Sequence, residues 1–169
     1  ACSTGQEPYS ISILIDEIGD KLGFFSFRDR FSITATDISD TALMLARSGK
    51  ANRFSVGRGL SAERKQKYFK EEGMHYLLDE KIKKRVQFRK LNLMDSFILL
   101  GKFDLVLCRN VAIYFTDEFK RHLFRKIAHI LNPDGLFIIG ASESLIGYSD
   151  DYTSEGHGNA IFYRVKPGI

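Results

Sequence analysis

The pattern of apolar and polar residues switches along the chain between the period of a helix and that of a strand. Apolar residues at positions 11, 14, 15 and 18 recur at helical spacing and predict a helix over residues 8–19. Three further helices are expected. The first begins at an N-cap of Ser39 or Asp40 and ends at Gly49, and the second runs from after Ser61 to Gly73. The third begins at Thr116 and is stopped by Pro133-Asp134-Gly135.

Short apolar runs predict strands at 31–36, 86–89, 103–108, 136–140 and 160–165. The run at 103–108 is continuous, as expected of a strand buried on both faces. Residues 75–85 predict an irregular strand or a hairpin around Asp79-Glu80-Lys81. This alternation of strands and helices predicts an α/β fold with a mostly parallel, doubly wound sheet and a ligand at the carboxyl ends of its strands.

The first nine residues form a run of small side chains that ends on Glu7 and Pro8. A small-residue loop that opens a helix lets a ligand approach the backbone and the N–H groups of the helix start. Proline suits the first helical position and disfavours a helical residue before it, so Glu7 would lie at the edge of the loop and accept hydrogen bonds from a ribose. The same residues fit a capping box between Thr4 and Glu7, which these residues alone slightly favour.

Polar residues follow each of the predicted strands. Asp37 follows the strand at 31–36, where an acid can bind ribose hydroxyls or act as a turn or cap residue. Residues 92–95, which follow the strand at 86–89, are suited to framing a purine. After Cys108 come Arg109 and Asn110, then an apolar patch and the phenol of Tyr114. A nucleoside lying across the strand ends would meet these groups in this order.

Composition narrows the class of protein. With 169 residues, 44% hydrophobic and 12% aromatic, the chain is expected to form one globular domain. It holds no apolar run of about 18 residues, so no membrane insertion is expected. Cys2 and Cys108 lack C-x-x-C spacing, which argues against a zinc site or disulfide framework, so we expect no metal and a reducing, cytoplasmic setting.

The chain carries a formal charge of +4. Basic residues cluster at 64–70, 81–85, 89–90 and 120–126. Such clusters can bind nucleic acid, a membrane surface or an acidic protein, or they can be solvated faces. No aromatic motif typical of single-strand binding accompanies them, so no nucleic-acid partner is expected.

Four motifs, taken together in their order, resemble the chemotaxis receptor methyltransferases, the CheR family. They are Ala1-Cys2-Ser3-Thr4-Gly5-Gln6-Glu7-Pro8-Tyr9-Ser10, Ala35-Thr36-Asp37-Ile38-Ser39, Cys108-Arg109-Asn110-Val111-Ala112-Ile113-Tyr114-Phe115 and Leu131-Asn132-Pro133-Asp134-Gly135, with Gly140-Ala141-Ser142-Glu143-Ser144 in support. The resemblance covers essentially all 169 residues. It implies a Rossmann-like class I methyltransferase that uses S-adenosylmethionine to esterify glutamate side chains on the cytoplasmic domains of chemoreceptors. It also implies an antiparallel C-terminal strand.

The resemblance assigns roles to individual positions. Glu7 and Asp37 would hold the nucleoside and methionine portions of the cofactor. Asn92 and Leu93 match positions beside the adenine. The remaining matches lie after the strand at 103–108: Asn110 and Val111 near the cofactor, Tyr114 toward the methyl group, and Arg109 as a group that orients the substrate carboxylate.

Two departures from the family pattern carry further expectations. A nucleotide-binding unit has a strand directly before its small-residue loop, so we expect the first central strand upstream of Ala1, and the family's N-terminal helical domain is not in this sequence. Residues 68–85 correspond to a small β-subdomain that in some members grips a receptor C-terminal pentapeptide. The short, single-glycine loop here resembles members that do not depend on the pentapeptide.

Other functions also fit the residues. The same fold and cofactor could serve RNA, DNA or a small molecule as acceptor, or the domain could bind its cofactor without turnover. No general base is evident, because the histidines at 75, 122, 129 and 157 match none of the strand-end sites.

Overall fold

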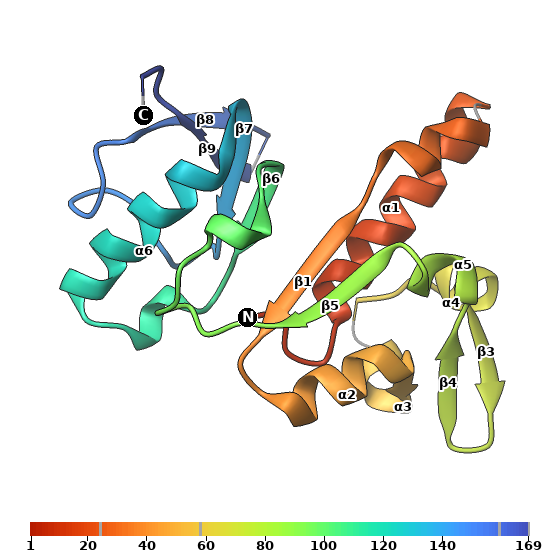
Figure 1. The fold of residues 1–169 in the computed structure, drawn as a ribbon. Coiled ribbons are helices and arrows are strands. Elements are labelled where there is room, and N and C mark those ends of the chain that lie inside the picture. The colour runs from red at the N-terminus through yellow and green to blue at the C-terminus, as the bar shows by residue number, and fades with distance from the viewer. Residues whose placement is uncertain (24, 58, 159, 169) are drawn as a thin grey trace. The chain divides into compact units, whose positions relative to one another are not determined.

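The computed structural model describes residues 1–23, 25–57, 59–158 and 160–168. The chain divides into two compact units, Ala1–Asn92 and Leu93–Ile169, here called the first and second unit (Figure 1). Each unit contains a parallel strand pair and at least one helix packed beside it, which confirms the predicted α/β class. No helix among the described residues is long and apolar enough to cross a bilayer.

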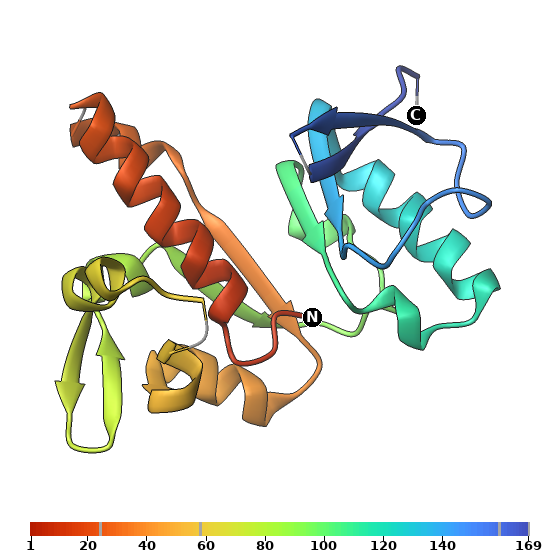
Figure 2. The ribbon, with the colours of Figure 1, turned by 180° about the vertical axis from the view of Figure 1, so that it is seen from behind.

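The first unit is built on the parallel pair β1 and β5. Its elements are α1 (Gln6–Leu22), a 3-10 helix (Phe25–Arg30), β1 (Ile33–Asp37), α2 (Asp40–Ser48), β2 (Lys50–Asn52), α3 (Arg53–Gly57), α4 (Ala62–Tyr68), β3 (Phe69–Glu72), β4 (His75–Leu78), α5 (Glu80–Lys83) and β5 (Val86–Lys90). Helix α1 packs along β1 and β5 (Figures 1 and 2). The core contains Tyr9, Ile13, Ala35, Tyr68, Leu78, Ile82 and Val86. The parallel register sets Asp37 opposite Lys90, so the two carboxyl strand ends lie side by side.

Helix α1 begins at Gln6, two residues earlier than predicted. Glu7 therefore lies in the first helical turn, and its expected position outside the helix is wrong. Proline is tolerated there because the first N–H groups of a helix have no intrahelical acceptor. The capping box is also wrong. The N-cap is Gly5, and the Thr4 hydroxyl donates to Gln6 Oε1 at 2.8 Å.

The predicted small β insertion is present, and its boundaries differ from the expectation. Its sheet has the order β2-β4-β3, so it includes Lys50–Asn52 as well as residues between 68 and 85. The helix expected to reach Gly73 ends at Tyr68, because the following residues pair with β4. Gly73, at φ +58°, makes the hairpin turn, and Asp79 caps the short helix α5 where a hairpin was expected.

The second unit is a four-stranded mixed sheet beside one long helix. Its elements are a 3-10 helix (Ile98–Leu100), β6 (Phe103–Cys108), a 3-10 helix (Ala112–Tyr114), α6 (Asp117–Ile130), β7 (Leu131–Ile139), β8 (Tyr152–His157) and β9 (Ala160–Val165). The strand order is β6-β7-β9-β8, with β6 and β7 parallel and the others antiparallel. The predicted C-terminal antiparallel strand is therefore confirmed, and β8 was not predicted.

Helix α6 packs on this sheet through its apolar stripe. Phe124 lies with its ring centroid 6.0 Å from that of Phe137, and its carbonyl accepts a hydrogen bond from Tyr152. The expected burial of β6 on both faces is wrong. This strand lies at the edge of its sheet, and Asp104 and Leu105 are exposed because the described part of the unit leaves them uncovered.

Candidate cofactor and acceptor site

The small-residue loop at the start of the chain is held against the end of β1. The Cys2 N–H donates to the carbonyl of Thr36 at 2.8 Å, and the Gly5 N–H donates to the carbonyl of Cys2 at 3.0 Å. Ser3 takes a left-handed conformation, with φ +49°. These contacts bring the loop, the start of α1 and the carboxyl end of β1 together within the first unit.

Asp37 is the residue that joins this loop to the strand end. Its Oδ2 accepts the Ser3 N–H at 2.8 Å, and its Oδ1 accepts the Ser39 N–H at 3.0 Å. Burial raises the pKa of the Asp37 carboxyl, but the backbone donors of Ser39 and Ser3 outweigh it and hold that pKa below its usual range. The carboxylate is therefore ionised at neutral pH. A carboxylate offers about four lone-pair sites, so acceptor capacity remains for other donors such as ribose hydroxyls.

Gly5 permits the close packing of the loop. A Cβ built there would lie 3.1 Å from Ala46 Cβ, 3.1 Å from Tyr9 Cε2 and 3.3 Å from Phe88 Cζ, and its φ of +90° disfavours side chains. Tyr9 is itself fixed, because its hydroxyl donates to the carbonyl of Ala46 at 2.7 Å. Burial raises the pKa of the Tyr9 phenol to about 12, so Tyr9 stays a neutral hydrogen-bond donor.

The two other predicted cofactor residues of the first unit lie near the same end of the sheet. Glu7 is half-buried in the first turn of α1, directly after the loop. Asn92 follows β5, whose last residue is aligned with Asp37. The first unit therefore brings Glu7, Asp37 and Asn92 to the helix start and strand ends, as the sequence predicts.

The remaining predicted residues belong to the second unit. Arg109 and Asn110 follow β6 directly and are exposed. Asn110 has a φ of +57°, a conformation that asparagine tolerates better than most residues. Val111 leads into the 3-10 helix, where Ala112 is buried and Tyr114 is 80% exposed. The segment thus presents an amide and a phenol to solvent on a backbone anchored by one buried alanine.

Glu143, whose role the sequence did not indicate, holds this segment in place. The Glu143 carboxylate accepts backbone N–H groups from Asn110, Val111 and Ile113, and from Gly140. In the sequence, Glu143 stands out only as part of the motif at residues 140–144. The signal that could have found it is an acid three residues after a glycine at a strand end.

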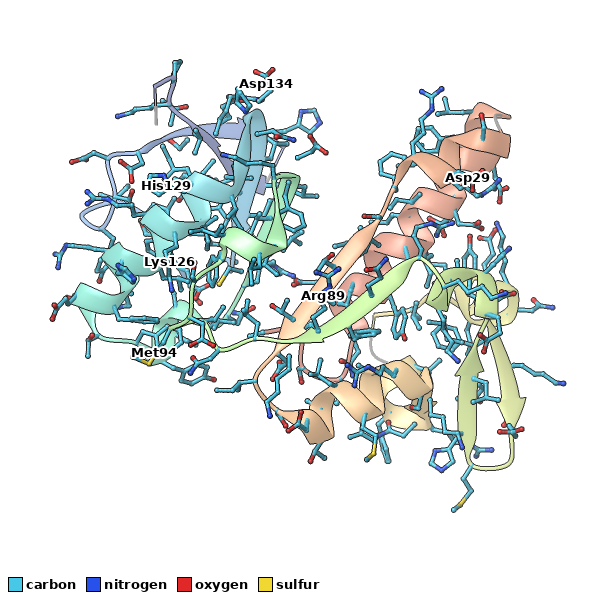
Figure 3. All side chains as sticks on the ribbon, viewed as in Figure 1. Asp29, Arg89, Met94, Lys126, His129 and Asp134 are labelled. Carbon is cyan, nitrogen blue, oxygen red and sulfur yellow. The ribbon has the colours of Figure 1, made fainter. Side chains whose placement is uncertain are left out.

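Leu93 lies in a segment that α6 holds in place. Lys126 donates to the carbonyl of Leu93 and, at 3.0 Å, to that of Asp95, and its ammonium lies 4.4 Å from the ring centroid of Phe97. Burial lowers the pKa of Lys126. Figure 3 labels Lys126 on α6 and Met94 in the segment that it binds. The position predicted to lie beside the adenine is thus fixed through its backbone.

Two other features do not add to the site. A hollow of about 250 Å³ in the first unit is lined by polar and apolar residues of α1, α3, α4 and the β insertion, together with Thr4, and Asp37 does not line it. The histidines at 75, 122, 129 and 157 are all exposed, as expected of surface side chains. Across the described ranges, no group of three His, Cys, Asp or Glu side chains could hold a metal ion.

The family of this chain is shown by a match along most of its sequence. Residues 1–160 match the family described as CheR methyltransferase, SAM binding domain. The chain belongs to the CheR methyltransferase family. The domain that gives this match binds S-adenosylmethionine, which is therefore the cofactor of this part of the chain.

Individual relatives in the CheR family cover nearly the whole chain. A protein of Pseudomonas aeruginosa named chemotaxis protein methyltransferase 1 is 44% identical over 98% of this chain and 61% of its own length. A chemotaxis protein methyltransferase of Vibrio parahaemolyticus is 42% identical over 98% of this chain and 60% of its own length. The chain therefore spans about three fifths of the length of these relatives.

Solved structures confirm the fold. A TehB-like SAM-dependent methyltransferase from Corynebacterium glutamicum aligns with a TM-score of 0.52, covering 97% of this chain and 74% of that chain at 14% identity. The predicted Rossmann-like class I methyltransferase fold is thus confirmed for this CheR family member.

Proposed function

We propose that this CheR family chain transfers methyl groups from S-adenosylmethionine to glutamate side-chain carboxylates of chemoreceptor cytoplasmic domains. The products are glutamate methyl esters and S-adenosylhomocysteine, and the role is adaptation in bacterial chemotaxis. The observation that carries the proposal is the 44% identity, over 98% of this chain, to a protein named as a chemotaxis methyltransferase.

The residues of the first unit fit the ribose side of the cofactor. The Asp37 carboxylate is ionised and fixed by backbone donors, so it can accept hydrogen bonds from ribose hydroxyls without changing its own conformation. We assign Glu7 to the same end of the cofactor, and we assign Asn92, together with Leu93 of the second unit, to its adenine. The loop at residues 1–5 is fixed beside these groups, because Gly5 lets it pack closely against Ala46, Tyr9 and Phe88.

The residues of the second unit fit the reacting end. We assign backbone and side-chain contacts with the cofactor to Asn110 and Val111, orientation of the acceptor carboxylate to Arg109, and a place beside the methyl group to Tyr114. The bound cofactor supplies a methyl group on a sulfonium, which is a strong leaving group. The phenol of Tyr114 is exposed and therefore available to a bound group.

The acceptor requires little chemical activation. A glutamate side chain has a reference pKa of about 4.3 and is an anion at neutral pH, so the chain needs no general base. The task of Arg109 and Tyr114 is to hold the carboxylate oxygen in line with the methyl group and the sulfur. Proximity and orientation of this kind can supply several kcal/mol of rate acceleration.

Two finer points belong to the proposal. We propose that docking does not require a receptor C-terminal pentapeptide, because the hairpin of β3 and β4 has a short turn with a single glycine at Gly73. We also propose a cytoplasmic location, because Cys2 and Cys108 lack the spacing of a disulfide framework.

The test is transfer of labelled methyl groups to receptor cytoplasmic fragments by the full-length protein. Label released as volatile methanol in alkali identifies a carboxyl ester and supports the proposal, and receptors with and without the C-terminal pentapeptide should be labelled equally. Label on RNA or a small molecule, stable to alkali, would show another acceptor. Cofactor binding with no transfer to any acceptor would show a binding module.

A further inference from the structure

Glu143 connects the segments that follow β6 and β7. Its Oε2 accepts the N–H of Gly140 and that of Asn110, both at 2.7 Å. Its Oε1 accepts the N–H of Val111 at 3.1 Å and that of Ile113 at 3.3 Å. All of these groups lie in the second unit, so one carboxylate gathers four backbone donors from two strand ends.

The donors converge because of the local backbone. Asn110 takes a left-handed conformation, with φ +57°, directly after β6, and the N–H groups of residues 110, 111 and 113 all meet the Glu143 carboxylate. Backbone N–H groups arranged in this way form a concave site for an anion. Glu143 supplies that anion from within the chain. Hydrogen bonds to a charged group are stronger than those between neutral groups.

The spacing leaves room only for glycine at position 140. A Cβ built at Gly140 would lie 2.7 Å from Glu143 Oε2, 2.9 Å from Asn110 Nδ2 and 3.0 Å from Asn110 N. The close approach of the two segments therefore depends on both the carboxylate of Glu143 and the absence of a side chain at Gly140.

We propose that Glu143 is a positioning residue that sets the conformation of residues 110–114 and thereby the places of Asn110 and Tyr114. This inference rests on the proposed methyltransferase function, in which that segment meets the cofactor and the acceptor. In this assignment Glu143 is not itself a contact of either, because its carboxylate binds the backbone of residues 110, 111, 113 and 140. It acts by fixing the left-handed turn at Asn110 and the 3-10 helix that carries Tyr114.

The test compares Glu143→Gln with the parent protein in its full-length form. The amide has the same size but only one acceptor oxygen, so its NH₂ group faces two of the four donors. Hydrogen exchange of the peptide covering 109–114 should become faster by at least about tenfold, and the Kd for S-adenosylhomocysteine should rise by about tenfold. Methyl transfer should fall further, because Tyr114 is displaced as well.

Two variants make the comparison sharp. Gly140→Ala should speed exchange in the same peptide, because the added Cβ pushes the Glu143 carboxylate away. Glu118→Gln removes the same charge from an exposed position on α6 and should leave exchange and binding unchanged.

The outcomes separate this inference from the proposed function. Unchanged exchange over 109–114 in Glu143→Gln, or uniformly faster exchange across the second unit, would overturn the positioning role. If the parent protein binds S-adenosylhomocysteine but methylates no receptor, the acceptor assignment fails, and exchange and Kd still decide the role of Glu143.

Discussion

Asp37 and Glu143 use the same physical device at the level of single residues. Each carboxylate accepts backbone N–H groups and so fixes a segment that follows a strand end. The difference lies in what remains available. The Asp37 carboxylate accepts the N–H groups of Ser3 and Ser39 and keeps acceptor capacity for a ligand, whereas four backbone N–H groups occupy the Glu143 carboxylate. Asp37 is therefore suited to binding, and Glu143 to holding the loop.

Tyr114 gives a residue-scale prediction about catalysis. Its side chain is 80% exposed, so removing the hydroxyl should not disturb folding. Tyr114→Phe should leave the Kd for S-adenosylhomocysteine unchanged and lower kcat by about tenfold, the value of one hydrogen bond made in the transition state.

The measurement is steady-state methyl transfer together with calorimetric binding. Tyr148→Phe is the control, because the Tyr148 hydroxyl contacts Asp117 in the same unit. A kcat equal to that of the parent protein, or a loss confined to cofactor affinity, would remove Tyr114 from the reacting end.

At the scale of elements, α6 positions the segment after β5 as well as covering its sheet. Lys126 lies on α6 and donates to the carbonyls of Leu93 and Asp95. Lys126→Met keeps the apolar stem but removes the donor, so the free energy of unfolding should fall by about 1–3 kcal/mol. Affinity for S-adenosylhomocysteine should fall as well, since Leu93 loses its anchor.

Chemical denaturation and calorimetry measure the two effects. Arg125→Met is the matched control. The Arg125 side chain is 71% exposed, and its ion pair with Asp151 is long, at 3.9 Å. Equal losses in both variants would mean that the charge of α6 matters and the anchoring of residues 93–95 does not.

Elements with strong local signals were predictable from the sequence. Helix α2 was predictable from its cap at Ser39 and from Gly49 at its end. Strand β1 and the position of Asp37 were predictable from an apolar run followed by a polar residue. The strands β2 and β8 were not predictable, because three residues and a polar run carry no strand period. Their pairing with β4 and β9 defines them.

The role of Glu143 was hidden for a related reason. Its partners at 110–113 lie about thirty residues away in the sequence, and no local pattern links them. A contact of this kind depends on the parallel pairing of β6 with β7, which brings the two strand ends together.

At the scale of the whole molecule, the formal charge of +4 predicts how the acceptor is recruited. Glutamate-rich acceptor segments should be attracted to this chain, and salt should weaken the attraction. Raising ionic strength from about 0.1 M to about 1 M shortens the screening length from about 10 Å to about 3 Å. KM for receptor fragments should therefore rise, while KM for S-adenosylmethionine, whose net charge is small, changes little.

Initial rates at several salt concentrations test this expectation. A receptor KM that does not respond to salt would show that docking depends on apolar contact. In that case the basic clusters are solvated faces, as Arg64 and Lys67 already suggest by pairing with Glu17 and Asp20.

Calorimetric binding of S-adenosylhomocysteine to Asp37→Asn tests most directly whether the carboxylate at the end of β1 holds the cofactor. Asp29→Asn, an exposed carboxyl of the first unit labelled in Figure 3, is the control. We expect the Kd to rise by at least about tenfold in Asp37→Asn and to stay unchanged in Asp29→Asn. A Kd for Asp37→Asn within about twofold of the parent value would contradict the assignment.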